Sequence, residues 1–409
     1  MRQRNRLAAL SIFARSLMQP HSTVEQIEDN RQIVSHLKQH ATLESLYRSD
    51  FYHKHGAAVE ELLNRPRIYM APSPEPQLAS FLRVVAWNIE RGAQFDRIAA
   101  ALTTHPVMRF ADVILLNEVD IGMARSGNRN VARDLAQALG MHAIYGAEFL
   151  EMTKGVGKEL ELDGENIGAL HGNCILTRRR FSNPRIIPLP ACCNQFEFAE
   201  KRYGRRVAVS IDVDLGGATL MAVTAHLEVY NSPACRARQM KAVLDEIDAR
   251  KINNPVLIGG DFNTNTFPRG TRLRTIRNLA RLLLTPRERL DGQLKWPHSR
   301  EPLFRLLNRR GYIVDDFNTD ETTCSVQINL LGDSAYLPRP ARNWAQKRLG
   351  GNQFILHFRL DWFAARGLRA LSDGKVVDEL TGQSSIGPRT ISGLGLSDHD
   401  PIVVDITPD

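Results

Sequence analysis

FLRVVAWN, residues 81–88, marks the point at which the sequence changes from a helical to a strand-rich pattern. It is a short apolar run rich in Val, which is typical of a strand buried on both faces. Similar segments follow: ADVILLNE at 111–118, ATLMAVTAH at 218–226, NPVLIGGD at 254–261 and DPIVVDI at 400–406. Helices are expected between some of them, the clearest beginning at Ser232 with Pro233 at its first position. The sequence therefore predicts an α/β (α+β) protein whose sheets are covered by helices.

The 80 residues at the N-terminus have a different pattern. A basic amphipathic helix is expected at the start, because Arg15 interrupts the apolar run too early for a signal peptide. Ser22 and Glu25 form a capping box for a second helix, and another is expected from Leu43 to Leu63. Four prolines between residues 66 and 76 predict a linker or an extended segment over 66–79. We therefore expect a helical N-terminal extension with a Pro-rich linker at 1–80 and one large domain at 81–409.

The composition of the chain favours certain partners and a certain cellular location. The chain has 409 residues, is 43% hydrophobic and carries a formal net charge of +8, which favours an anionic partner such as nucleic acid, a phosphorylated molecule or a membrane surface. No segment is apolar for long enough to cross a bilayer, so no stable membrane insertion is expected. The five cysteines show no CxxC spacing, which argues against a disulfide framework or a zinc cluster. Cys192 and Cys193 are therefore expected to be buried thiols in a reducing, cytoplasmic location.

Polar side chains stand where these strands begin or end. They are Asn88 and Glu90, Glu118 and Asp120, His226, Asp261 and Asn263, Asp361, and Asp398 and His399. Any one of them alone would be an ordinary cap, turn residue or structural histidine. Together they predict a site, because binding sites of open α/β sheets form at strand ends and carboxylates and amides are ligands for Mg²⁺.

Seven segments carry a family resemblance: WNIERG, LLNEVD, HGNCILTR, TAHLE, GGDFNT, RLDWF and LSDHDPI. In this order they resemble the motifs of the endonuclease/exonuclease/phosphatase superfamily, over about residues 81–409. That superfamily includes DNase I-like nucleases, abasic-site endonucleases, inositol polyphosphate 5-phosphatases, neutral sphingomyelinases and deadenylases. The resemblance implies a DNase I-like four-layer sandwich, with two packed β-sheets flanked by helices and the site at one end.

The resemblance also implies a metal wall. Glu118 is similar to the principal ligand of Mg²⁺, for which Mn²⁺ is a possible substitute. Asn88 and Glu90 complete this wall through metal or water contacts, and Asp398 resembles a second metal or substrate contact. Asn117 stands where many members have Gln and is expected to play the same supporting part.

A second group of residues is implied to carry the chemistry. Asp261 resembles the carboxylate that orients or deprotonates the attacking water, and Asn263 would hold that water or a phosphate oxygen. His226 would donate to a phosphoryl oxygen, while His399 resembles a site histidine that Asp361 holds. An imidazolium or a divalent ion stabilises the charge of the transition state, and an oriented base activates water. Whether Asp261 or His399 takes the proton stays open at this point.

Two further residues are candidates for substrate binding. Asn173 in HGN stands where the family often places an amide that contacts phosphate. His171, two residues before it, is a candidate substrate contact, although an ordinary loop histidine is the simpler interpretation.

A basic insert at about 266–355 bears on the substrate. Within 266–310 its acidic residues are only Glu288, Asp291 and Glu301. Its basic and aromatic residues include Arg269, Arg272, Arg274, Arg277, Arg281, Arg339, Arg342, Lys347, Arg348, Trp344 and Phe354. Basic groups among aromatic ones suit a phosphate backbone with stackable bases, although anionic headgroups or a solvated surface would also explain them.

Three functions are consistent with these features. The favoured one is a Mg²⁺-dependent nuclease that acts on DNA or RNA. The alternative is a phosphatase or phospholipase C-like enzyme that acts on inositol phosphates, sphingomyelin or another small phosphorylated substrate. A non-enzymatic nucleic-acid-binding protein is disfavoured, because the whole set of site residues is present. No oligomeric state is predicted.

Overall fold

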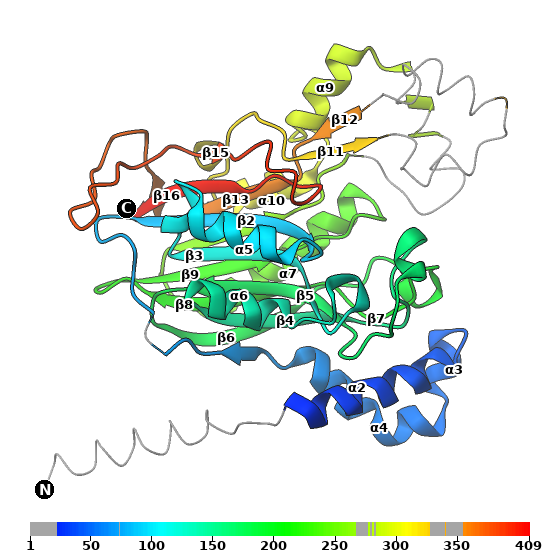
Figure 1. Cartoon of the computed structure of the whole chain (residues 1–409). Helices are drawn as coiled ribbons and strands as arrows, with labels where there is room; N and C mark the ends of the chain where they lie inside the picture. Colours follow the sequence, from blue (N-terminus) through cyan, green and yellow to red (C-terminus); the bar gives the residue numbers. More distant parts are fainter. Residues whose placement is uncertain are drawn as a thin grey trace, which may run out of the picture.

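The computed structural model describes residues 23–72, 74–266, 277–278, 280–281, 284–327, 340 and 355–409, with the backbone alone for 23–29. Two β-sheets pack face to face, and helices cover their outer faces (Figure 1). This is the expected four-layer α/β sandwich, so the fold prediction is confirmed. Among the described residues, no helix is both long and apolar enough to cross a membrane.

The larger sheet has nine strands in the order β1-β4-β5-β3-β2-β16-β14, with β7 paired to β4 and β15 paired to β16. β2 and β3 are parallel, and the other pairs are antiparallel. Its strands are β1 (Arg67–Tyr69), β2 (Leu82–Arg91), β3 (Val113–Ile121), β4 (His142–Glu151), β5 (Leu170–Thr177), β7 (Arg202–Gly204), β14 (Leu368–Ala370), β15 (Arg389–Thr390) and β16 (Ile402–Pro408).

The smaller sheet has five strands in the order β13-β10-β9-β8-β6, of which β9 and β10 are parallel. They are β6 (Phe181–Pro188), β8 (Val207–Asp214), β9 (Thr219–Ala225), β10 (Val256–Asp261) and β13 (Asp361–Arg366). A separate two-stranded sheet joins β11 (Cys324–Gln327) to β12 (Ile355–Phe358).

Three layers of apolar side chains hold the sandwich together. The inner faces of the two sheets enclose one cluster, to which β2, β8, β10 and β13 all contribute. A second cluster packs α5 (Phe95–Thr104) and α6 (Val131–Leu139) on the larger sheet, and a third packs α7 (Pro233–Ala249) and α10 (Pro302–Arg309) on the smaller one. A further helix among the described residues is α9 (Arg287–Lys295). The 3₁₀ turns are Met108–Phe110, Ala124–Ser126, Gly157–Glu161, Gln195–Glu197 and Asp315–Phe317.

The N-terminal helices pack against the sandwich, at the bottom of the view in Figure 1. They are α2 (Thr23–Lys38), α3 (Leu43–Tyr47) and α4 (Asp50–Asn64). The single helix expected over 43–63 is wrong, because Ser49 accepts a hydrogen bond from the Tyr52 amide and begins a new helix there. The expected extended segment begins with β1, which pairs with β4. The division of the chain into an extension and a domain stays a prediction.

The cysteines depart from expectation. Cys192 is paired in a disulfide with Cys235, and their Cα atoms are 6.1 Å apart. The prediction that Cys192 is a buried thiol is therefore wrong, because folding brings a loop and the start of α7 together across 43 residues of sequence. Cys193 is a free, half-buried thiol.

Only part of the expected basic insert can be placed. Arg277 and Arg281 are among the described residues. The other basic and aromatic residues named for this insert lie outside the described residues, namely Arg269, Arg272, Arg274, Arg339, Arg342, Lys347, Arg348, Trp344 and Phe354.

Candidate active site

The ends of strands from both sheets meet at one end of the sandwich. β2 and β3 are parallel neighbours in the larger sheet, as are β9 and β10 in the smaller one. Asn88 on β2 donates a hydrogen bond from Nδ2 to Asp261 Oδ2 on β10 over 3.2 Å. This bond crosses from one sheet to the other, so polar residues of different strands lie in one place.

Glu118, near the end of β3, forms one wall of this site with Asn88. Asn88 Nδ2 donates to Glu118 Oε1 over 3.4 Å, and Arg91 Nε lies 3.9 Å from Glu118 Oε2. Burial opposes ionisation, but Arg91 and the other cations nearby hold the pKa of the Glu118 carboxyl well below its ordinary value. Glu118 is therefore an ionised carboxylate.

The backbone at this wall is strained. Glu90, Glu118 and Asn263 have φ angles of 45°, 53° and 51°, in the left-handed region that L-residues rarely adopt. Each such residue costs about 1–2 kcal/mol. The register of β2 against β3 shifts beside Glu90, and that of β3 against β5 shifts beside Glu118. Irregularities of this kind redirect side chains and gather at functional sites.

The carboxylates around Glu118 fit a divalent cation. Burial, together with the charges of Asp398 and Glu118, raises the pKa of Glu90. Three carboxyl groups that repel one another are stabilised by a bound cation, and their oxygens suit Mg²⁺ or Mn²⁺. Among the described residues, Glu90, Glu118 and Asp398 are not one of the groups whose potential ligand atoms all lie within 4.8 Å of one another. Mg²⁺ usually keeps several waters and takes only one or two carboxylates.

Asp261, the last residue of β10, is buried and held at both oxygens. The Asn263 amide donates to Oδ1 over 2.8 Å, while Asn88 Nδ2 and Asn263 Nδ2 each donate to Oδ2 over 3.2 Å. The backbone N–H of Asp261 donates to Asn117 Oδ1 over 2.8 Å. Burial raises the pKa of Asp261 to about 7, against the opposing charge of His399. This carboxyl can therefore exchange a proton near neutral pH.

His226, directly after β9, lies between Asp261 and Arg206. Its Nε2 is 3.4 Å from Asp261 Oδ2, and its Nδ1 is 2.7 Å from Arg206 Nη1. A guanidinium only donates, so Nδ1 is the acceptor and Nε2 carries the ring proton. Burial and the charge of Arg206 hold the pKa of His226 well below its ordinary value. His226 is thus a neutral imidazole that presents an N–H to the site.

His399 also faces Asp261 but has a carboxylate behind it. Its Nε2 is 3.8 Å from Asp261 Oδ2, and its Nδ1 is 2.7 Å from Asp361 Oδ2. Thr323 Oγ1 donates to the same Asp361 oxygen over 2.6 Å. Burial opposes the charged ring, but Asp361 and the groups near it hold the pKa of His399 well above its ordinary value. His399 is therefore an imidazolium.

The two candidate substrate contacts, Asn173 and His171, lie buried on β5. Asn173 Nδ2 donates to Glu148 Oε1 over 3.0 Å, and its Oδ1 accepts from Asn117 Nδ2 over 2.8 Å. A phosphate contact by Asn173 would have to replace one of these bonds. His171 is a strand residue, so the loop interpretation is wrong, and its Nδ1 is 2.8 Å from Asp120 Oδ1.

Several residues that hold the site were not predicted, above all Arg206, Thr323 and Arg91. Arg206 stands in GRRVAV, directly before the apolar run of β8. The available signal was that a buried histidine such as His226 needs a hydrogen-bond partner at its second ring nitrogen. Nothing local in the sequence distinguishes Thr323 from other threonines in loops.

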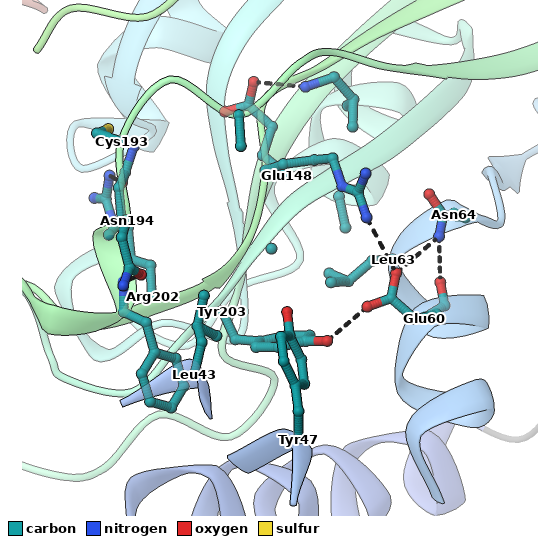
Figure 2. Close-up of a pocket in the computed structure, with 17 residues that line it drawn as sticks. Leu43, Tyr47, Glu60, Leu63, Asn64, Glu148, Cys193, Asn194, Arg202 and Tyr203 are labelled. Carbon is teal, nitrogen blue, oxygen red and sulfur yellow. Dashed lines mark hydrogen bonds and ion pairs between the residues drawn. The ribbon is translucent and has the colours of Figure 1, made fainter. Parts of the chain in front are cut away.

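A cavity of about 250 Å³ lies apart from these residues, between the N-terminal helices and β4 and β7 (Figure 2). Tyr203 Oη donates to Glu60 Oε1 over 2.6 Å, and Arg205 Nη2 is 3.6 Å from Glu60 Oε2. Glu148 also lines the cavity and pairs with Arg206, which in turn contacts His226. One wall of the cavity is therefore linked to the site through this ion pair.

Comparison with known proteins gives a match to one protein family. The model of the Endonuclease/Exonuclease/phosphatase family matches residues 85–399. That span contains every residue predicted for the site, from Asn88 to His399. No curated protein matches the chain in sequence.

Three solved structures are similar at low identity. An endonuclease/exonuclease/phosphatase from Beutenbergia cavernae is 18% identical over 80% of this chain and 72% of its own, with a TM-score of 0.46. The human Nocturnin catalytic domain with bound sulfate anion is 13% identical over 84% and 97%, with a TM-score of 0.45. D. rerio TDP2 complexed with single strand DNA product is 18% identical over 80% and 99%, with a TM-score of 0.39. At these identities the likeness does not identify a substrate.

Proposed function

Because the chain belongs to the endonuclease/exonuclease/phosphatase family, we propose that it is a metal-dependent phosphoesterase that hydrolyses DNA or RNA by direct attack of water. One observation carries this proposal. Asp261, with a pKa raised by burial to about 7, lies within 4 Å of one neutral and one cationic imidazole, and Asn88 links it to Glu118.

Glu118 would hold Mg²⁺ or Mn²⁺, with Asn88, Glu90 and Asp398 around it. A divalent ion at this place supplies positive charge to the oxygens of the phosphate. The support for this assignment is the all-oxygen donor set and the pKa of Glu90, which is raised by burial and by its acidic neighbours.

Asp261 is the proposed base that takes the proton of the attacking water. Asn263 fixes this carboxylate through two hydrogen bonds, which leaves it oriented for one proton transfer. Asp361 stabilises the protonated form of His399, so His399 would act as a cationic donor to the phosphate. The neutral His226 would add a second N–H donor, and both would act where negative charge develops.

Nucleic acid is the proposed substrate. The net charge of +8 and the basic insert suit a polyanion. Phe198 and Tyr230 are 38% and 39% exposed, and their ring centroids are 5.5 Å apart at an interplanar angle of 88°. Tyr230 follows His226 by four residues in the sequence, and this exposed aromatic pair is the proposed surface on which a base would stack. A small phosphate ester would interact with the same basic groups but would not need the aromatic rings for binding.

A panel of substrates tests the proposal. Purified protein is incubated with Mg²⁺, Mn²⁺ or a chelator and offered single-stranded and duplex DNA, abasic duplex, RNA, inositol phosphates and sphingomyelin. We expect hydrolysis of nucleic acid that the chelator abolishes, that Glu118→Ala and His399→Ala both eliminate, and that the surface control Glu61→Gln retains. Phe198→Ala should raise KM for nucleic acid roughly fivefold while leaving hydrolysis of bis(p-nitrophenyl) phosphate unchanged.

Each alternative has its own outcome. Full activity of Glu118→Ala or His399→Ala would remove those residues from the site. Preferred hydrolysis of inositol phosphates or sphingomyelin would replace nucleic acid with a small phosphorylated substrate. Tight binding of DNA without hydrolysis of any substrate would indicate a binding protein.

A further inference from the structure

Cys324, the first residue of β11, lies beside His399. Their backbones form an isolated antiparallel bridge, and the Asp400 amide donates to the Thr323 carbonyl over 2.7 Å. Residues directly opposed in an antiparallel pair have Cβ atoms about 4.5–5.5 Å apart, so the thiol is placed next to the imidazole. Cys324 is a free cysteine that is 4% exposed, and the reaction proposed above gives it no role.

Cys324 belongs to a group of three potential metal ligands. Its Sγ, a carboxylate oxygen of Asp398 and a ring nitrogen of His399 all lie within 4.8 Å of one another. Nδ1 of His399 is engaged by Asp361, which leaves Nε2 for a cation. Histidines that bind metals usually donate their other nitrogen to a carboxylate in this way, so the imidazole is already held as a ligand would be.

The ligand set selects the metal. A thiolate, an imidazole and a carboxylate are typical zinc ligands, whereas Mg²⁺ takes oxygens. Zinc ligands lie about 2.0–2.3 Å from the ion and therefore roughly 3.5 Å from one another. Asp398 is exposed, so its side chain can rotate to close the remaining distance and solvent can deliver the ion.

We propose that Cys324, Asp398 and His399 form a second metal site, which binds Zn²⁺ and thereby inhibits hydrolysis. Binding would release the thiol proton of Cys324 and the Nε2 proton of His399 to solvent. His399 would then have no proton to offer a phosphate oxygen. The inhibition rests on the proposed function, whereas the binding does not.

Metal binding is tested without any substrate. Protein stripped of metal is titrated with Co²⁺ as a spectroscopic probe and with Zn²⁺ by calorimetry. We expect a thiolate-to-cobalt charge-transfer band in the near ultraviolet, which one equivalent of Zn²⁺ displaces. Cys324→Ser should lose the band and bind Zn²⁺ at least about tenfold more weakly, since even the loss of a group that only orients a ligand costs that much.

Two further variants keep this test decisive. Cys193→Ser is the matched control, because it removes another free and more accessible thiol, and it should keep both the band and the affinity. Cys324→Ala, which suits the apolar cluster of β11, β12 and α9 around this residue, covers the case that Ser impairs folding. A band that persists in both Cys324 variants, or that is absent from the unmodified protein, would overturn the site.

Inhibition is tested at saturating Mg²⁺. Zn²⁺ should inhibit the unmodified protein and Cys193→Ser, while Cys324→Ser should keep its rate with Mg²⁺ and be at least about tenfold less sensitive to Zn²⁺. Zinc binding through Cys324 without inhibition would overturn the regulatory part alone. If no substrate is hydrolysed, the proposed function fails while the titrations still decide the metal site.

Discussion

His226 and His399 are two buried histidines at strand ends that face the same carboxylate. Their Nε2 atoms lie 3.4 and 3.8 Å from Asp261 Oδ2. They differ in what stands behind them, since Nδ1 contacts Arg206 in one and Asp361 in the other. Burial disfavours the charged ring in both, but Arg206 lowers the pKa of His226 further while Asp361 raises that of His399. Burial and Arg206 therefore act together to keep His226 neutral, whereas Asp361 keeps His399 charged against the effect of burial.

The difference in charge between His226 and His399 affects the pKa of Asp261 and so its ability to act as a base. Two imidazolium groups beside Asp261 would lower its pKa and make it a poor proton acceptor at neutral pH. With only His399 charged, burial still raises the pKa of Asp261 to about 7. One cation to stabilise the phosphate and one neutral donor thus leave the carboxylate basic enough for the reaction.

Among the changes behind the two histidines, Asp361→Asn should have the largest effect, because it removes the carboxylate that keeps His399 charged. We expect kcat to fall about 1000-fold, within the range for loss of an oriented acid–base group, and the pKa of His399 to fall. Steady-state kinetics would measure kcat, and NMR titration of labelled histidine rings would measure the pKa of His399. The control is Asp315→Asn, which removes a carboxylate 3.3 Å from another histidine, His298, and should leave kcat unchanged. An unaltered His399 pKa in Asp361→Asn would contradict this account.

Arg206→Met should act on His226 in the opposite direction. The pKa of His226 should rise because its cationic neighbour is gone, and activity should fall about 100-fold. The free energy of unfolding should drop by about 3–5 kcal/mol, because Glu148 is left buried without its partner. Adding Glu148→Gln should recover part of the stability in denaturant unfolding but not the activity. If the folded variant kept a low His226 pKa, Arg206 would not be what holds that ring neutral.

The pH dependence of the reaction tests the base. Asp261 accepts a proton only when ionised, and its folded-state pKa is raised, so kcat/KM should increase as pH rises through about 7. Below the midpoint the rate should fall about tenfold per pH unit. A bound cation would move the midpoint lower. Measurement from pH 5 to 9 at fixed metal concentration checks this, and a rate that rises toward acid would exclude Asp261 as the base.

The sequence predicted the strands and their ends because both depend on local pattern. Buried strands are continuous apolar runs, and the polar residues that follow them are adjacent in sequence, as in 254–261 followed by Asn263. Asp361, which holds His399 Nδ1, was predicted through the family resemblance, but Arg206 at His226 Nδ1 and Thr323 behind Asp361 could not be found in the same way. Arg206 and Thr323 reach the site through strand pairing and a loop, and the Cys192–Cys235 disulfide also depends on contacts between distant segments. Tertiary contacts of this kind leave no periodic signal in the chain.

The smallest expected effect concerns Thr323, which supports only the His399 side of the comparison. Its Oγ1 donates to Asp361 Oδ2 and accepts from the Leu360 and Asp361 amides over 3.0 and 3.1 Å. Thr323→Val removes these bonds and should lower kcat about fivefold, in line with roughly 1 kcal/mol for one hydrogen bond. Thr323→Ser keeps the hydroxyl and should retain the rate. If Val retained the rate, the hydroxyl would not position Asp361, and the charge of His399 would depend on Asp361 alone.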